Sequence, residues 1–507
     1  MDDSKGPAER GYFRNWMSIA GIGVMAVSLF FGVLLAVQEL ISGEALAYSG
    51  ILYVLCTSGI VVGFLLVPLG ALMERWRRKG GRRARPLSEF RFDLRDREHR
   101  VGALALLTTA VLALTLVPVG AYQTFHATES LEFCGQLCHE VMNPEWVRYQ
   151  DSSHARVNCV NCHIGPGAGW FVRSKLSGLR QIWAVTTNSF PRPIPTPIHD
   201  LRPARETCEQ CHWRRQFIGY KELSRAYFLS DEENTLHQLR MLIKIGGEKT
   251  TFMRGSGIHY HMLIASDIEF IATDDRRQEI AWVRVTRGDG SITEFEPSGD
   301  PLSDEEKAMF EVRKMDCMDC HNRPSHQFPE PMGRVNDALG EGSISLELPS
   351  IKVQAIKALD GGYATTEEAM TGIANSMREF YRSEYPEILA KKPHALTSSI
   401  KKIQSIYRET IFPEMKADWS AYPDNIGHRD SPGCFRCHND ELESAKGETI
   451  FTTCNKCHLI LAQGESIEHV DVNLEEGLPF IHPEDFDTIE EYTECHDCHT
   501  GGADLYE

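Results

Sequence analysis

The sequence predicts a mainly α-helical protein in two parts: a membrane anchor of three transmembrane helices and a large exported domain with little regular secondary structure. Two observations lead to this fold class. The first quarter of the chain holds three long runs without a charged residue, and 14 of the 15 cysteines stand in seven close pairs, each followed directly by a histidine. The remainder of the chain is strongly acidic.

The three apolar runs predict the membrane anchor. Residues 17–38, 45–73 and 101–125 contain no Asp, Glu, Lys or Arg. Each run reaches the roughly 20 apolar residues that a helix needs to cross a bilayer. Because three such runs lie so close together in the sequence, buried core helices of a soluble domain are the weaker interpretation. We expect residues 1–125 to form this anchor.

Basic residues predict the orientation of the anchor. Between the second and third runs, residues 74–85 carry seven Lys and Arg against the single acid Glu74, and such loops stay in the cytoplasm. The N-terminus, with Lys5, Arg10 and Arg14, falls on the same side. The residues after about Tyr122 then lie on the outer side of the membrane. The tripeptide 45–47 resembles a signal-peptidase site, but the first run is longer than a signal h-region, so we expect an uncleaved helix.

Charge is divided unevenly between the two parts. Residues 1–123 have a net charge of +4 and the remainder has −22. An acidic exported domain argues against nucleic-acid binding and suits basic, soluble protein partners, because complementary charge raises encounter rates.

The paired cysteines predict covalently attached haem. Six pairs match the c-type attachment pattern Cys-x-x-Cys-His, in which two thioether bonds hold the porphyrin and the histidine ligates the iron from the proximal side. These six are Cys159/Cys162/His163, Cys208/Cys211/His212, Cys317/Cys320/His321, Cys434/Cys437/His438, Cys454/Cys457/His458 and Cys495/Cys498/His499. One such motif can arise by accident or bind zinc, but six in an exported domain indicate a multihaem cytochrome c.

The first motif is irregular. Cys134 and Cys138 enclose three residues instead of two, and His139 follows in its usual place. The extra residue need only bulge the loop, so we expect attachment here too, for a total of seven haem c groups. The unpaired Cys56 lies inside the second apolar run and is interpreted as a small buried apolar residue.

An electron-carrying haem iron also needs a sixth ligand. Twelve exported histidines outside the motifs are available for seven irons. The strongest candidates are His154, His326, His428 and His482, followed by one of His259 and His261 in GIHYHM and, more weakly, His126. Met142, three residues after His139, is a candidate at the first haem, where a thioether would raise the potential; alternatively, it packs on the macrocycle.

The run CHEVMNPEWVRYQDSSHARVNCVNCHIGPGAGWFVRSKLSGLRQ, with RPARETCEQCHW after it, resembles the NapC/NirT/NrfH family of membrane-anchored multihaem quinol dehydrogenases. With its three apolar runs and seven motifs, the chain is most similar to the seven-haem inner-membrane ImcH-type cytochromes of metal-reducing bacteria. The resemblance implies oxidation of menaquinol near the first haem, with Lys175 and Gln181 as site residues, and transfer to soluble periplasmic c-type cytochromes. The family usually has one membrane helix and four or five haems, which leaves the electron acceptor open.

The motifs divide the exported part into three segments. Residues 126–220 form a three-haem module, 221–330 a β-containing spacer with the fourth haem, and 331–507 a helical spacer followed by the last three haems. A small β-hairpin insert is expected around the turn 287–290, and a capping box of Ser303 and Glu306 starts a helix expected to run into the fourth motif. Residues 365–381 and 395–412 have helical periodicity.

Three functions remain open on the sequence alone. Electron relay from quinol is the leading hypothesis. A terminal reductase for nitrite, hydroxylamine or a sulfur oxyanion is the alternative, although it needs an open iron site and no motif here ends in lysine in place of histidine. A third possibility is a subunit that anchors a separate reductase.

Overall fold

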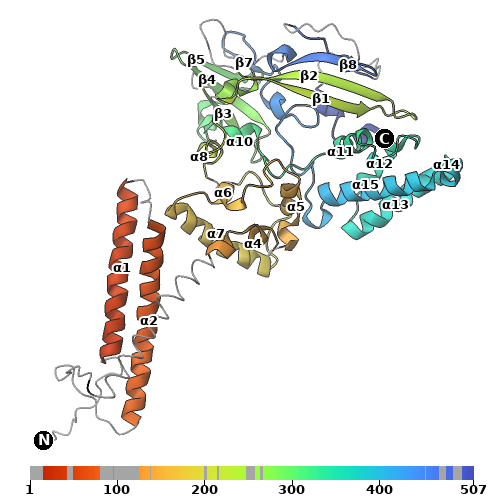
Figure 1. The fold of residues 1–507 in the computed structure, drawn as a ribbon. Helices are drawn as coiled ribbons and strands as arrows, with labels where there is room; N and C mark the ends of the chain where they lie inside the picture. The colour runs from red at the N-terminus through yellow and green to blue at the C-terminus, as the bar shows by residue number, and fades with distance from the viewer. Residues whose placement is uncertain are drawn as a thin grey trace. The chain divides into compact units, whose positions relative to one another are not determined.

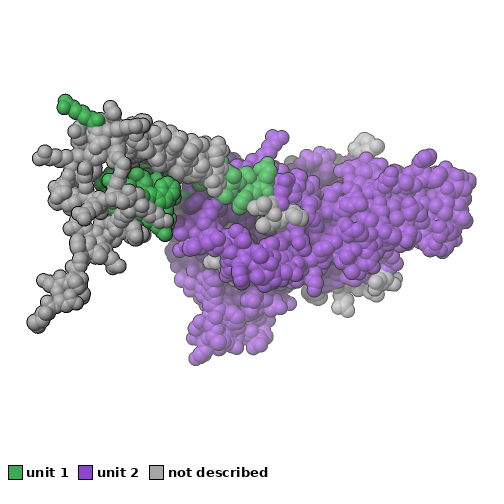
Figure 2. Space-filling model, turned by 90° about the horizontal axis from the view of Figure 1, so that it is seen from below, with its two compact units in different colours: residues 1–133, 167–169 green, residues 134–166, 170–507 purple. Residues whose placement is uncertain are grey.

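The computed structural model describes residues 15–42, 49–79, 95, 125–136, 139–198, 202–213, 216–246, 257–262, 266–450, 453–467, 476–483 and 494–506. The chain divides into two compact units, coloured in Figure 2: residues 1–133 with 167–169, and residues 134–166 with 170–507. The second unit carries the described residues of all seven cysteine motifs, and we call it the haem unit.

The first unit contains two long antiparallel helices, α1 (Trp16–Ser42) and α2 (Ser49–Lys79) (Figure 1). Small residues line their contact: a Cβ atom on Gly21 would lie 2.7 Å from the carbonyl oxygen of Gly63. The Ser18 hydroxyl donates a hydrogen bond to the carbonyl oxygen of Val67 (2.9 Å). Close backbone approach through small residues is typical of helix pairs in membranes.

Both helices are apolar and long enough to span a bilayer, over Trp16–Leu35 and Leu55–Arg77. Large apolar side chains such as Phe30 and Phe64 point away from the helix pair and are exposed. The described residues therefore hold two candidate spans, not the three that the sequence predicts. Of the expected third span, residues 101–124 lie outside the described residues.

The described residues of the haem unit form two antiparallel sheets. The first has the order β1-β2-β8, formed by Gly219–Phe228, Leu236–Gly246 and His458–Gly464. The second has the order β6-β3-β4-β5-β7, formed by Arg313–Lys314, Ser266–Ala272, Ile280–Arg287, Ile292–Pro297 and Leu442–Ser444.

The predicted hairpin is confirmed, but the expectation of only one small β insert is wrong. Strands β4 and β5 are joined by a turn in which Gly290 has a φ of 84°, a left-handed conformation that glycine adopts without steric cost. The sheet β1-β2-β8 was not predicted. Its pairing joins β2 to a strand more than 200 residues later, and no local pattern signals such a partner.

Five helices form the largest apolar core of the haem unit. They are α11 (Pro331–Gly340), α12 (Ile351–Leu359), α13 (Thr366–Ser383), α14 (Pro386–Lys391) and α15 (Pro393–Thr410). Their apolar faces meet around fully buried side chains such as Ile373, Met377 and Ile403. Helices α13 and α15 confirm the periodicity seen in the sequence.

The capping box of Ser303 and Glu306 is present and starts α9 (Asp304–Lys307). The expectation that this helix continues into the fourth motif is wrong. The chain instead becomes extended, because Arg313 and Lys314 pair with β3 as strand β6. That strand leads into α10 (Cys317–Cys320), the turn of the fourth motif.

The other motifs lie on single helical turns or run just beyond them. These turns are α6 (Cys159–His163), α8 (Ala204–Cys208), η5 (Gly433–Arg436), η6 (Cys454–Lys456) and α16 (Cys495–Cys498). The first motif is divided between α4 (Leu131–Gln136) and α5 (His139–Gln150). After the second motif comes α7 (Ala168–Thr186), a longer helix.

Candidate haem centres

The described motif cysteines form no disulfides. Every cysteine among the described residues is a free thiol, and none of the described motif cysteines is fully buried. This donor set fits a porphyrin held by two thioether bonds, because each thiol can be reached from outside the polypeptide. Five of the motif cysteines are exposed: Cys162, Cys211, Cys434, Cys454 and Cys498.

Cys211 lies further beyond its helical turn than the other described motif cysteines do. Cys208 and Cys211 belong to one motif, but α8 ends at Cys208. Cys211 lies three residues beyond the helix, and its side chain is exposed. Backbone hydrogen bonds still close the turn: the N–H groups of Cys211 and His212 both donate to the carbonyl oxygen of Cys208, at 3.1 Å and 2.8 Å. Cys211 therefore remains a proposed attachment point, but it is held by a turn and not by a helix.

Six motif histidines each face a second histidine. The ring centroids are 6.0 Å apart for His154 and His212, 6.3 Å for His163 and His326, 6.3 Å for His259 and His321, 5.7 Å for His261 and His438, 6.2 Å for His428 and His458, and 6.1 Å for His482 and His499. Two imidazoles on opposite sides of one metal ion, each bonded at about 2 Å, have centroids roughly 6 Å apart. The six pairs therefore fit a haem iron with two axial histidines.

The pairing does not follow the order of the sequence. His154 stands just before the second motif but faces the third, whereas His326 follows the fourth motif and faces the second. His428 precedes the fifth motif and faces the sixth. Only His482 faces the motif that it directly precedes. Apart from the seventh motif, the partner histidine therefore comes from a more distant part of the chain.

Where the sequence favoured one of His259 and His261, the structure places both opposite motif histidines. They lie on the single 3-10 turn η3 (Ile258–Met262), between β2 and β3. His259 Nδ1 is 3.0 Å from the carbonyl oxygen of Ile245, and His261 Nδ1 is 3.0 Å from that of Ile258. The Nε2 atom of His261 points at Nε2 of His438, 3.5 Å away.

Backbone carbonyls orient the partners of the second and third motifs in the same way. His326 Nδ1 lies 3.0 Å from the carbonyl oxygen of Glu145, and His154 Nδ1 lies 3.1 Å from that of Pro324. A carbonyl oxygen can only accept, so each Nδ1 carries the proton and each Nε2 has a free lone pair. This arrangement is typical of metal-binding histidines, because it fixes the tautomer and the ring orientation.

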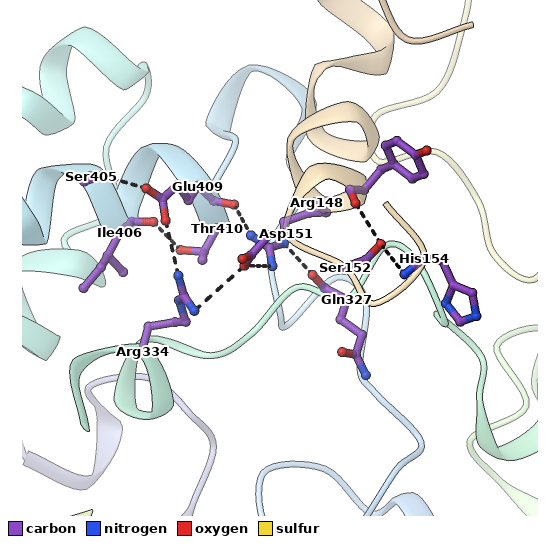
Figure 3. Close-up of polar contacts among 11 residues, drawn as sticks. Arg148, Asp151, Ser152, His154, Gln327, Arg334, Ser405, Ile406, Glu409 and Thr410 are labelled. Carbon is purple, nitrogen blue, oxygen red and sulfur yellow. Dashed lines mark hydrogen bonds and ion pairs between the residues drawn. The ribbon is translucent and has the colours of Figure 1, made fainter. Parts of the chain in front are cut away.

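Arg148 contacts both of the loops that carry His154 and His326 (Figure 3). The Arg148 guanidinium is almost fully buried on α5 and donates to the carbonyl oxygens of Gln327 (2.6 Å) and Glu409 (3.0 Å). It also pairs with Asp151 at 2.8 Å. Arg334 extends the network from α11 to the Glu409 carboxylate on α15 (3.2 Å). This network joins helices α11 and α15 of the apolar core to α5 and to the loops that carry His154 and His326.

The surroundings of His326 favour its neutral form. Burial lowers the pKa of His326 to about 4. The nearby Glu145 carboxylate is also enclosed: burial raises its pKa, while the Arg323 guanidinium, 3.7 Å away, opposes the rise. A neutral imidazole is the form that binds a metal ion.

The first motif differs from the others in its packing. Gly135, the second residue of the stretched motif, is buried against Trp146 of α5, and a Cβ atom there would lie 2.1 Å from the indole ring. Cys138 and the side chain of His139 lie outside the described residues. Met142 is half-buried, and positions 139 and 142 fall on the same face of α5, since residues three apart are neighbours on a helix.

The remaining predicted residues are placed as follows. His126 packs edge-on against Phe125, with ring centroids 5.6 Å apart. Lys175 and Gln181 both lie on α7. The Lys175 ammonium is 4.8 Å from the centre of the Phe171 ring, and the Gln181 amide donates to Ser177 (3.3 Å). Six residues correspond to about 120° around a helix, so Lys175 and Gln181 do not share a face.

Sequence reasoning missed the groups that position the histidines. Apart from the contact of Arg148 with Asp151, Arg148 and the carbonyl oxygens of Glu145 and Pro324 lie 170 to 261 residues from the groups that they contact. No motif signals a backbone acceptor. A buried arginine on an otherwise ordinary helix is also invisible to local patterns.

The chain is similar to a known protein family over residues 96–194 and to a known protein over nearly its full length. Residues 96–194 match the NapC/NirT cytochrome c family, N-terminal region. The chain is 39% identical over 500 residues to the cytochrome c-type protein ImcH of Geobacter sulfurreducens, covering 97% of this chain and 96% of that protein. It is 35% identical over 80 residues to the cytochrome c-type protein NrfH of Wolinella succinogenes, covering 15% of this chain and 44% of that protein. No solved structure matches the chain.

Proposed function

Because this chain belongs to the NapC/NirT family of c-type cytochromes and, over its full length, to the ImcH-like members of that family, we propose that it oxidises menaquinol and relays the electrons through seven covalently bound haems to soluble periplasmic c-type cytochromes in anaerobic respiration. Haem c, when bound, carries single electrons by changing the oxidation state of its iron. The chain's own task is then to attach, orient and order these groups.

The six facing histidine pairs carry this proposal. Imidazoles on both sides of the metal leave no position for a substrate, which suits electron transfer. We therefore assign His154, His259, His261, His326, His428 and His482 as distal ligands, with the motif histidines that face them as proximal ligands. The first motif stands apart, with Met142 as its candidate thioether ligand on the same helix face as position 139.

Contacts between successive motifs support a relay in the order of the sequence. The Cys134 thiol lies in hydrogen-bond contact with Cys159, and the Cys208 thiol with Cys317. The turn α8 of the third motif packs against both α6 and α10. Further on, Arg436 of the fifth motif donates to the carbonyl oxygen of Asp319 in the fourth (2.6 Å).

The last motifs continue the series. Burial raises the pKa of Cys457, and the nearby thiol of Cys434 raises it further. Burial likewise raises the pKa of Cys495, and the nearby thiol of Cys454 raises it further. These contacts support a relay that follows the order of the motifs in the chain, in which electrons that enter at the first motif would leave near the last.

Entry at the first motif is supported by its position in the chain. Cys134 follows the predicted third span by nine residues, so a donor dissolved in the bilayer has the shortest path to it. Lys175 is the proposed residue for binding quinol and accepting a proton from it. The acidic charge of the exported part would steer basic acceptor proteins toward it.

Reduction of the detergent-purified full chain by a menaquinol analogue tests this function. We expect seven attached haems by intact mass, low-spin spectra for at least six of them, and stepwise reduction by quinol in a potential titration. Clearly fewer attached groups, or a failure of quinol to reduce a protein that dithionite reduces fully, would contradict the relay. A high-spin ferric signal that responds to nitrite, hydroxylamine or a sulfur oxyanion would favour the terminal reductase.

A further inference from the structure

Helix α7 presents an apolar stripe that no other described part of the chain covers. Val172, Leu176, Leu179 and Trp183 have exposed fractions of 55%, 63%, 65% and 68%. Their spacing of four, three and four residues places them on one face of the helix over a length of roughly 17 Å. Ile182, at its margin, is exposed by 58%.

Comparison within the same unit shows that this exposure is unusual. The amphipathic helices α13 and α15 bury their apolar faces against each other, with Ile373 and Ile403 fully buried. The stripe of α7 has the same kind of helical spacing but no such partner among the described residues. In Figure 1, α7 lies at the end of the haem unit opposite the two sheets, not among the packed helices.

The charge of this segment is opposite to that of the domain around it. Residues 164–199 contain no Asp or Glu, whereas the chain after residue 123 has a net charge of −22. Helix α7 itself carries three cations, Arg173, Lys175 and Arg180. On a helical projection, Lys175 borders one side of the stripe, and Arg173 and Arg180 border the other. An apolar face flanked by Lys and Arg is the pattern of helices that lie in a membrane surface, with their cations reaching the lipid headgroups.

We propose that α7 is a second, peripheral membrane-binding element, which lies in the headgroup region of the bilayer with its stripe among the acyl chains and its cations at anionic phospholipids. Connectivity suits this occupant. Eight residues separate the predicted third span from Cys134, and the Cys134 thiol contacts Cys159, on the turn that leads into α7. The lipid contact does not depend on quinol oxidation, because its source is the stripe and its cations.

Photolabelling of the full haem-loaded chain in liposomes tests this contact. The probe is a phosphatidylcholine with a photoactivatable group in its acyl chain, and labelled peptides are identified by mass spectrometry. We expect label on residues 172–183 as well as on α1 and α2, and none on α13 or α15. The double variant Leu179→Gln/Trp183→Gln should lose at least three-fold of the α7 label with the label on α1 unchanged. The control Ser177→Gln, on the opposite face of α7, should keep it.

Two further measurements separate this proposal from its alternatives. Replacing half of the phosphatidylcholine by phosphatidylglycerol should raise the α7 label, and Arg173→Gln/Arg180→Gln should remove that rise. Labelled membrane helices with an unlabelled α7 would overturn the proposal. So would a loss of low-spin haem in Leu179→Gln/Trp183→Gln, because the stripe would then be a haem-packing surface. Loss of quinol oxidation with the α7 label intact would instead count against the proposed function alone.

Discussion

His259 and His261 are separated by one residue on the turn η3, yet His259 faces His321 of the fourth motif and His261 faces His438 of the fifth. Two successive proposed haem sites therefore share one short turn, which lies between β2 and β3 in the sequence. A change at this turn would affect both sites together, and the two haems would be close neighbours in the relay.

His261→Ala is expected to convert one haem of the seven to a high-spin form. The fifth motif keeps both cysteines and His438, so attachment should be unaffected and intact mass should still give seven groups. Electron paramagnetic resonance and optical spectra measure the spin state. His394→Ala, at an exposed histidine near the start of α15, is the matched control and should change neither signal. An unchanged low-spin spectrum in His261→Ala would contradict the assignment of His261 as the ligand opposite His438.

Arg148→Met is expected to destabilise the haem unit by about 2–4 kcal/mol, because it leaves two carbonyl oxygens and a carboxylate without their buried partner. Denaturant unfolding followed by circular dichroism measures the change. The loop of Pro324 and His326 should also loosen, which would show as heterogeneity in the spectra of two haems. Arg382→Met is the control: this exposed arginine pairs with Glu379 on the surface of α13, and its loss should cost less than about 0.5 kcal/mol. Equal effects of the two variants would argue against a structural role for Arg148.

Gly135→Ala tests the packing of the stretched motif. The added methyl group would overlap the Trp146 ring, and overpacking of this kind costs about 1–3 kcal/mol. We expect lower stability and incomplete haem attachment at the first motif alone, measured by intact mass. Gly178→Ala, in the middle of α7 with nothing within 4 Å of its added Cβ, should be neutral or stabilising. Full attachment and unchanged stability in Gly135→Ala would show that the indole ring can move aside.

The parts of the fold that could be predicted are those encoded locally. The turn at Gly290, the capping box of Ser303 and the periodicity of α13 each depend on residues within one or two turns of chain. The cysteine motifs are also encoded by residues that are close together in the chain. The pairing of strand β8 and the partner of His163 could not be predicted in this way. His326 lies 163 residues after His163, and β8 pairs with β2 across more than 200 residues. Tertiary contacts decide these choices, and the sequence limits them only to a set of candidates.

Lys175→Ala should slow reduction by a menaquinol analogue roughly tenfold or more, a loss of about 1.4 kcal/mol of transition-state stabilisation. Reduction by dithionite should be unchanged, because it needs no quinol site. Gln181→Ala separates the two residues that the family resemblance implied: they lie about 120° apart around α7, so a quinol bound at Lys175 should not contact Gln181. We therefore expect less than a twofold effect from Gln181→Ala. Arg180→Ala controls for the loss of one positive charge on the same helix. Equal rates of reduction by quinol in Lys175→Ala and the unaltered protein would show that Lys175 is not part of the quinol site. If Gln181→Ala were reduced slowly by quinol and Lys175→Ala at the unaltered rate, the quinol would bind on the other face of the helix.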